Sequence, residues 1–199
     1  TDIEGLFAAG EVVGGANGAN RLSGNAITEA LVFGEVAGKN AGIFALGSVL
    51  ELDKTKRIIP DWLANRLQDE GDKKLASPTA LVRELQKVMQ GKVGPFRTAG
   101  GLQDALKWIA KKNLILRDLP VGLEKKFNLS LVDWFDLRNM LLVAECIVVS
   151  ALKRKESRGA HQREDFPTME EAWAVNQLLL LKEGNLELSS AGVPKVIEL

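Results

Sequence analysis

The sequence predicts a mainly α-helical protein, in which a strand, a glycine-rich loop and a helix lead into an antiparallel helical bundle and a small C-terminal β-hairpin. Ten of the 19 glycines in this 199-residue chain precede Leu50, whereas apolar residues at helical spacing dominate after Ser77. Near the C-terminus the turn residues Glu183-Gly184-Asn185 separate two apolar runs, which is typical of a hairpin.

These shifts in composition divide the chain into three parts. Residues 1–48 hold the glycine-rich segment, residues 49–76 form a connector whose charges we expect on a solvated face, and residues 77–199 form the helical domain with its hairpin. With 46% hydrophobic residues the chain can bury a core. Basic and acidic residues balance at 26 each, so no nucleic-acid partner is indicated, and no apolar run is long enough to span a membrane.

Metal ligands are scarce, since the chain has one histidine, His161, and one cysteine, Cys146. The cysteine lies in an apolar helical pattern that is typical of a packing residue. A single thiol forms no internal disulfide and no iron–sulfur or zinc set. We therefore expect no metal site and a reducing compartment, the cytoplasm.

The N-terminal segment combines three features of a site for an anion or a nucleotide. Leu6–Ala9 reads as a short buried strand, Gly10–Gly24 is a glycine-rich loop, and a helical pattern begins at about Asn25. Glycines allow backbone N–H groups to approach a ligand, and a helix N-terminus concentrates unpaired donors and partial positive charge. Ser23 or Asn25 can cap this helix.

Two charged side chains in the loop have the chemistry of ligand contacts. Glu11 follows the predicted strand and can accept hydrogen bonds from sugar-type hydroxyls. Arg21 is permanently charged and planar, so it can hold a carboxylate through two parallel hydrogen bonds. After the loop, Gly34, Gly38 and Gly42 leave one helix face bare for close packing. A solvent loop before an ordinary helix would explain the glycines but not the arginine embedded among them.

Three helices are expected in the second half of the chain. Ser77 caps the first, which covers residues 78–90, and Gly101–Asn113 form the second. The third, Ser130–Lys155, has apolar residues around so much of its circumference that it must be largely buried, and a capping-box pattern begins at Ser130. Three helices of this kind predict an antiparallel bundle.

A dense run of charges, Arg154–Asp165, follows the third helix. Its alternating signs are typical of a structural ion-pair network, so we interpret it as a hydrogen-bonded clasp that docks the bundle onto the N-terminal domain. The other interpretation gives His161 a role in proton transfer, and the clasp is preferred.

Two motifs resemble one known family. The first motif reads GLFAAGEV from Gly5 and GANRLSGNAITEALVFG from Gly18. It resembles the last FAD-contacting segment of the succinate dehydrogenase and fumarate reductase flavoproteins, a family that includes L-aspartate oxidase. Lys155–Pro167, KESRGAHQREDFP, is similar to the SRGAHxRED signature in the helical C-terminal domain of that family. In one place the chain departs from the family, where Asn17 stands for the histidine of HGANRL.

The resemblance implies part of an FAD-binding site and one substrate contact. Arg21 would hold a carboxylate of a C4-dicarboxylate substrate, and Glu11 would accept hydrogen bonds from the ribityl or ribose hydroxyls of FAD. Backbone amides after the loop would face the pyrimidine edge of the flavin and stabilise negative charge on the reduced ring. The implied cofactor-binding residues are Gly10, Glu11, Gly24, Asn25, Ala26 and Ile27.

The activity implied by the resemblance is hydride transfer between flavin N5 and a C4 dicarboxylate, which interconverts succinate and fumarate. Family members begin with a GxGxxG unit that is absent here, so we interpret the chain as the C-terminal portion of a longer or split flavoprotein, inactive without its N-terminal FAD-binding region. A dehydrogenase or reductase type implies an iron–sulfur partner subunit, through which the protein would associate with a membrane. Two alternatives stay open: L-aspartate oxidase, and a non-catalytic helical interaction module.

Overall fold

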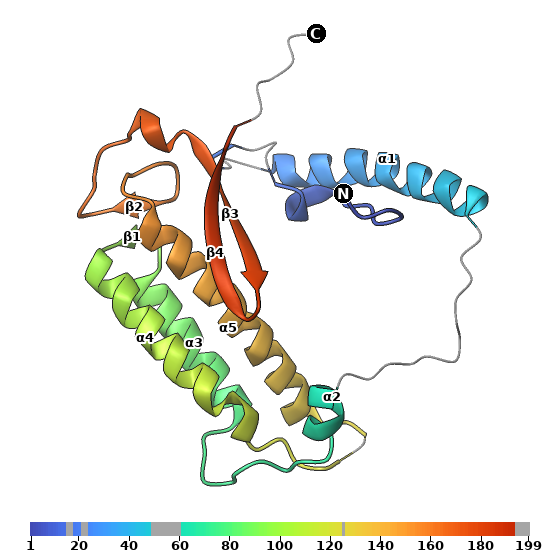
Figure 1. Ribbon diagram of the computed structural model, residues 1–199, viewed down its shortest axis with the longest axis vertical. Coiled ribbons are helices and arrows are strands. Elements are labelled where there is room, and N and C mark those ends of the chain that lie inside the picture. Colours follow the sequence, from blue (N-terminus) through green and yellow to red (C-terminus); the bar gives the residue numbers. More distant parts are fainter. Residues whose placement is uncertain (15–17, 21–23, 49–60, 125, 194–199) are drawn as a thin grey trace. The chain divides into compact units, whose positions relative to one another are not determined.

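The structure, a computed structural model, describes residues 1–14, 18–20, 24–48, 61–124 and 126–193. The chain divides into two compact units, Thr1–Ile58 and Ile59–Leu199 (Figure 1). The boundaries expected after residues 48 and 76 stay a prediction, since the first borders a stretch outside the described residues.

The N-terminal unit consists of a 3-10 turn, η1 (Gly10–Val12), and a long helix, α1 (Asn25–Gly47). Leu6–Ala9 was expected as a strand and forms none, because no strand partner for its backbone hydrogen bonds lies in the described part of the chain.

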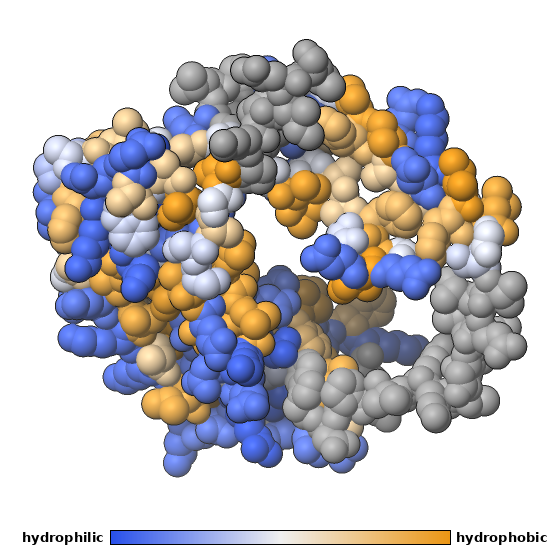
Figure 2. Space-filling model, turned by 45° about the horizontal axis from the view of Figure 1, so that its top comes forward, coloured by the Kyte–Doolittle hydropathy of each residue, from blue (hydrophilic) through white to orange (hydrophobic). Residues whose placement is uncertain are grey.

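Helix α1 is apolar around its circumference, yet no residue of it is buried. Leu31 is 70% exposed and Leu46 is 92% exposed, and Figure 2 shows hydrophobic atoms on the surface of this unit. On the face formed by Gly34, Gly38 and Gly42, no other described part of the chain lies within 4 Å of the positions where side chains would begin. A helix with this pattern is typical of a protein interior.

The C-terminal unit is a bundle of α3 (Pro78–Lys92), α4 (Ala99–Ile115) and α5 (Leu129–Lys153), in which consecutive helices run in opposite directions (Figure 1). The three predicted helices and their antiparallel arrangement are thereby confirmed. A short helix, α2 (Asp61–Arg66), and two 3-10 turns, η2 (Leu116–Asp118) and η3 (Glu171–Trp173), complete its helical part.

The core of the unit lies where α5 packs against α3 and α4. Its fully buried aliphatic side chains recur at helical spacing on the facing sides of these three helices. They are Leu81 and Leu85 of α3, Leu102 and Ile109 of α4, and Leu137, Leu141 and Val148 of α5. Each such side chain stabilises the bundle by about 1.5–3 kcal/mol relative to an exposed one.

At two helix starts the structure tests a predicted cap, and it confirms one and contradicts the other. Ser77 caps α3 as predicted, because its hydroxyl accepts a hydrogen bond from the Ala80 amide at 3.3 Å. In α5 the cap is Asn128 rather than Ser130, and the Asn128 side chain accepts from the Leu131 amide at 2.9 Å. The capping box predicted at Ser130 is therefore wrong, since a left-handed turn just before Asn128 starts the helix earlier.

The predicted hairpin is confirmed by β3 (Val175–Lys182) and β4 (Asn185–Gly192), which pair antiparallel. Glu183 and Gly184 have φ values of 50° and 81°, the backbone of a tight turn whose twist suits antiparallel strands. A second small pair, β1 (Phe96–Arg97) and β2 (Gln162–Arg163), is parallel and joins the α3–α4 connection to the segment after α5.

Candidate functional site

The glycine-rich loop of the N-terminal unit places Gly10 directly against α1. Gly10 is buried with φ at 80°, and a Cβ at this position would lie 3.3 Å from the Cβ of Ala30. A side chain here would strain the backbone and press on α1, so the close approach requires glycine. Glu11 follows in the same 3-10 turn and is exposed.

The start of α1 supplies the backbone amides that the sequence assigns to a ligand. The helix is preceded by Gly24, whose carbonyl accepts a hydrogen bond from the Ile27 amide at 3.1 Å. The Asn25 and Ala26 amides lie in the first turn, where a helix provides no carbonyl partner of its own. Capping by Asn25 is wrong, because Asn25 is itself the first helical residue, and Ser23 lies outside the described residues.

Arg21, the predicted substrate contact, lies outside the described residues, as does Asn17. The structure therefore defines the two ends of the predicted site, at Gly10 and at Gly24, and the role of Arg21 stays a prediction. These ends belong to one compact unit.

The charged run after α5 folds around Glu156, which is fully buried. Its carboxylate accepts hydrogen bonds from Arg154 Nη1, from Arg158 Nε at 2.9 Å, and from the Glu170 amide at 3.0 Å. Burial alone would raise the pKa of Glu156, but these hydrogen bonds outweigh it and lower the pKa to about 2. The group is thus an ionised structural anion.

Arg163 forms a second centre in the same run. Its side chain is 1% exposed and makes two hydrogen bonds of 2.7 Å to the carboxylate of Asp165. Its Nη1 also donates to the carbonyl of Ala151 at 2.8 Å, near the end of α5, where helix carbonyls lack partners. Asp165 accepts in turn from the Ala99 amide at the start of α4, at 3.1 Å. The clasp interpretation is confirmed within the bundle, and its docking onto the N-terminal domain stays a prediction.

His161 is held in one tautomer inside the clasp. Arg97 Nη1 lies 3.3 Å from His161 Nδ1, and a guanidinium only donates, so Nδ1 accepts and the proton resides on Nε2. Burial, and then the charge of Arg97, lower the pKa of His161, so the ring is neutral at pH 7. In the described part of the chain no group of three His, Cys, Asp or Glu side chains could hold a metal.

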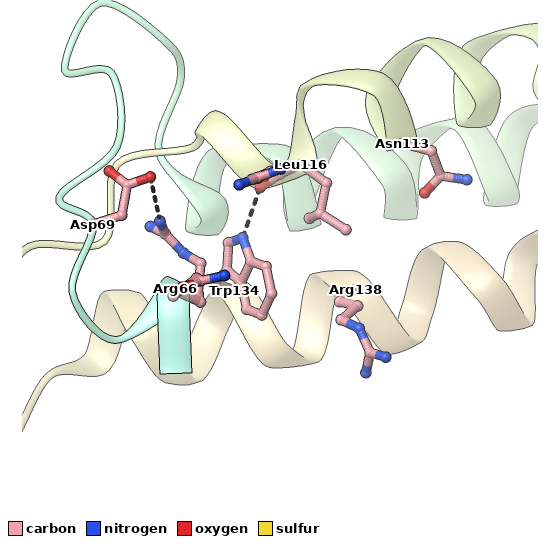
Figure 3. A pocket seen from close by; sticks show the side chains of 8 residues that line it. Arg66, Asp69, Asn113, Leu116, Trp134 and Arg138 are labelled. Atoms are coloured by element: carbon pink, nitrogen blue, oxygen red, sulfur yellow. Dashed lines mark hydrogen bonds and ion pairs between the residues drawn. The ribbon is translucent and has the colours of Figure 1, made fainter. Parts of the chain in front are cut away.

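A cavity of about 470 Å³ lies at the other end of the bundle, between α2, η2 and α5 (Figure 3). Arg66, 4% exposed, donates from Nη2 to the Leu119 carbonyl at 2.8 Å and lies 5.4 Å from the centre of the Trp134 ring. Asp69 lies 3.8 Å from its Nη1. The expectation that the connector charges form a solvated face is therefore wrong for Arg66, which packs into the base of the bundle.

Comparison with known proteins assigns the fold to a family. A family model described as fumarate reductase flavoprotein C-term matches residues 82–195, which is more than half of the chain. The chain belongs to the fumarate reductase flavoprotein family. A second model, described as FAD binding domain, matches residues 1–27 of this flavoprotein. The two matches cover the loop with the start of α1, and most of the helical unit with its hairpin.

Relatives of this flavoprotein are similar over most of its length. An uncharacterised FAD-dependent oxidoreductase of Methanocaldococcus jannaschii is 39% identical over 179 residues, 90% of this chain and 32% of that protein. A fumarate reductase (CoM/CoB) subunit of Methanothermobacter marburgensis is 37% identical over the same shares. A solved structure of E. coli quinol fumarate reductase has a TM-score of 0.85 and 29% identity, covering 99% of this chain and 35% of that chain.

A more distant relative is an L-aspartate oxidase of Yersinia pestis, 33% identical over 168 residues, 84% of this chain and 29% of that protein. This flavoprotein chain thus spans about a third of the length of the relatives that it matches. The family resemblance and the predicted fold class are confirmed. Within the described residues, no helix has the length and apolarity needed to cross a membrane.

Proposed function

We propose that this chain is the C-terminal part of an FAD-dependent oxidoreductase that interconverts succinate and fumarate. The observation that carries the proposal is the order of the two family matches, with the FAD-binding model on residues 1–27 and the fumarate reductase C-terminal model on residues 82–195. The M. marburgensis relative, named as a fumarate reductase subunit, is similar over 90% of this chain.

The described ends of the loop fit a flavin. Gly10 keeps the backbone close to α1 without a side chain between them, and Glu11 is an exposed acceptor for the hydroxyls of FAD. The first-turn amides of Asn25 and Ala26 lie at the positive end of a 23-residue helix, and Gly24 leaves their approach open. When bound, FAD supplies the hydride-accepting or hydride-donating atom.

Arg21 is assigned to the substrate. It lies within the glycine-rich loop Gly10–Gly24, and its planar guanidinium can hold a carboxylate through two hydrogen bonds. Fixing one carboxylate orients the carbon skeleton of a dicarboxylate, and such orientation lowers the entropic part of the barrier to hydride transfer. The amides at the start of α1 would stabilise negative charge on the reduced flavin.

The rest of the flavoprotein would cover α1. This helix exposes apolar side chains on every side, and the relatives are about three times as long as this chain. We assign the covering surface to the remaining N-terminal FAD-binding region. The same proposal includes electron transfer through an iron–sulfur subunit. The flavoprotein would lie on the cytoplasmic side and associate with a membrane through that partner. This part of the proposal rests on the family alone.

L-aspartate oxidase is the second candidate, favoured by the Y. pestis relative. Its substrate also carries two carboxylates, so the same arginine would serve. The SGNA turn that ends at Ala26 and the Arg163-Glu164-Asp165 triplet are closer to the dehydrogenase and reductase branch, which is why that branch stands first.

The test is an assay of the intact flavoprotein, with its upstream region, for succinate oxidation, fumarate reduction and aspartate oxidation. We expect retained flavin and turnover of succinate and fumarate. Arg21→Lys keeps the charge but loses the planar fork, and it should lower this turnover by orders of magnitude while flavin stays bound. Arg83→Lys, at an exposed position of α3, is the matched control. Turnover of aspartate alone would favour L-aspartate oxidase instead. Unchanged kinetics in Arg21→Lys would show that Arg21 does not bind the substrate.

A further inference from the structure

A shallow cavity of about 390 Å³ opens beside the clasp, at the end of α5 between β1 and β3. Arg97, Arg154, His161, Gln177 and Ser150 supply its polar lining, and the described residues that line it include no acid. Such a lining offers hydrogen-bond donors and positive charge, so the cavity suits an anionic acceptor.

Arg97 is the charged group without a counter-charge in this cavity. It is partly buried, and its Nε donates to the Gly94 carbonyl at 2.8 Å while its Nη1 contacts His161. Its Nη2 has no hydrogen-bond partner, and no carboxylate pairs with it, within the described residues. Burial, and then the nearby charge of Arg163, lower the pKa of Arg97.

Two neutral donors in the cavity also lack a hydrogen bond of ordinary length within the described residues. Nε2 of His161 carries the proton, as the contact with Arg97 requires, and it is buried there with no partner at hydrogen-bond distance, although the backbone carbonyl of Arg154 is near enough to raise the pKa of the ring. Arg154 Nε donates to Gln177 Oε1 at 3.4 Å, which fixes the orientation of this amide and leaves Gln177 Nε2 as a second buried donor without a partner there. A buried donor without an acceptor destabilises the folded protein, so both groups favour an incoming acceptor.

The surface of α5 beside the cavity is apolar and exposed. Ile147 lines the cavity and is 43% exposed, and Val143, one turn earlier on the same helix face, is 56% exposed. An unpaired cation beside exposed aliphatic side chains has the composition of a protein–protein or domain interface rather than of a site for a free ion.

We propose that this cavity receives the carboxylate of an aspartate or glutamate from the part of the flavoprotein outside this chain, as the charged anchor between the helical domain and the FAD-binding region. The inference rests on the proposed function, which supplies that region. About two thirds of the length of the relatives lies outside the matched part, so such a region is available to cover the apolar face of α5. The guanidinium of Arg97 would pair with the carboxylate, and His161 and Gln177 would donate to its oxygens.

The experiment is zero-length crosslinking of the intact flavoprotein with a water-soluble carbodiimide, which condenses an amine with a carboxylate in contact with it. Arg97→Lys keeps the positive charge and places an amine in the cavity. Two native ion pairs are internal positive controls, Lys92–Asp104 at 2.8 Å and Lys112–Glu84 at 3.0 Å. We expect peptide mapping to find the new amine joined to an acid upstream of Thr1, and Arg97→Gln to give no such product.

Several results would overturn the inference. They are a crosslink only to Asp165 of the clasp, a crosslink only to a different polypeptide, or no crosslink while both internal pairs react. A second measurement uses Cys146, which lines the same cavity. Arg97→Gln should make it react with an alkylating reagent about tenfold faster in the intact protein, since a charged hydrogen bond is lost, whereas Arg83→Gln should not. Equal rates in both variants would also refute the anchor.

The same preparation separates this inference from the proposed function. If the protein turns over succinate and fumarate but forms no crosslink, only the anchor is refuted. If it forms the crosslink but turns over neither acid, only the proposed activity is refuted.

Discussion

Glu156 is the residue on which the clasp depends most. It has no exposed surface, and two guanidinium groups and one backbone amide share its carboxylate. A buried ion pair contributes little net stability, but removing one partner leaves the other charge buried without compensation, which is strongly destabilising. Arg154 and Arg158 are 14% and 24% exposed, so neither can regain full hydration without unfolding the clasp.

We therefore expect Glu156→Gln to lower the free energy of unfolding of the helical unit by roughly 3 kcal/mol. Urea unfolding followed by tryptophan fluorescence measures this change, because all four tryptophans lie in Ile59–Leu199. Glu164→Gln is the matched control, since Glu164 lies in the same run and is exposed, and its effect should stay within about 0.5 kcal/mol. Equal effects of the two substitutions would contradict this account of the clasp.

The same carboxylates predict how stability depends on pH. For Asp165 the hydrogen bonds from Arg163 are the main cause of a pKa lowered to about 2, and Glu156 has a similar value. A depressed pKa in the folded state means that the unfolded chain binds protons first as pH falls. The stabilisation is therefore complete above the ordinary carboxyl pKa, about 4, and is lost as pH falls toward about 2. Urea midpoints across this window should fall steeply, and Glu156→Gln with Asp165→Asn should flatten the slope.

At the scale of single elements, the periodicity of α5 predicts where the helix lies but not which residue caps it. The apolar pattern places this helix correctly, but it favours Ser130 as cap, whereas Asn128 makes the capping hydrogen bond. We expect Asn128→Ala to cost about 1 kcal/mol of unfolding free energy and the exposed Ser130→Ala less than about 0.5 kcal/mol. Thermal unfolding of the two variants is the measurement, and the reverse order of costs would reinstate the capping box.

The packing of η1 on α1 gives a second prediction at this scale. Gly10 and Gly14 both have positive φ, 80° and 67°, so alanine would strain either backbone. At Gly10 the added Cβ would also meet Ala30 at 3.3 Å, whereas at Gly14 it would meet nothing within 4 Å among the residues that the structure describes. In the intact flavoprotein, Gly10→Ala should therefore release more flavin than Gly14→Ala, measured as flavin absorbance retained after gel filtration. Equal retention would show that this contact does not shape the site.

For the whole molecule, the sequence predicts what depends on local pattern and misses what depends on distant partners. The bundle and the hairpin follow from periodicity and turn residues, and the family follows from two motifs. Leu6–Ala9 is misread because a strand needs a neighbour that the local sequence does not contain. Burial of Arg66 depends on the carbonyl of Leu119, 53 residues later. The tautomer of His161 depends on Arg97, 64 residues earlier. Nothing in the sequence near any of these residues indicates such contacts.

The exposed apolar surface of α1 leads to a prediction for the chain as a whole. Leu31, Phe33 and Leu46 are 70%, 55% and 92% exposed, and apolar surface of this extent on one helix is rare on a protein that is complete by itself. Chain 1–199 alone should therefore enhance the fluorescence of a hydrophobic dye and self-associate in gel filtration. The intact flavoprotein should do neither, because its FAD-binding region would cover this helix. Fragment 59–199 is the matched control, since it keeps the buried core and lacks α1. If chain 1–199 stays monomeric and does not enhance the fluorescence of the dye, α1 is not a surface that the FAD-binding region covers.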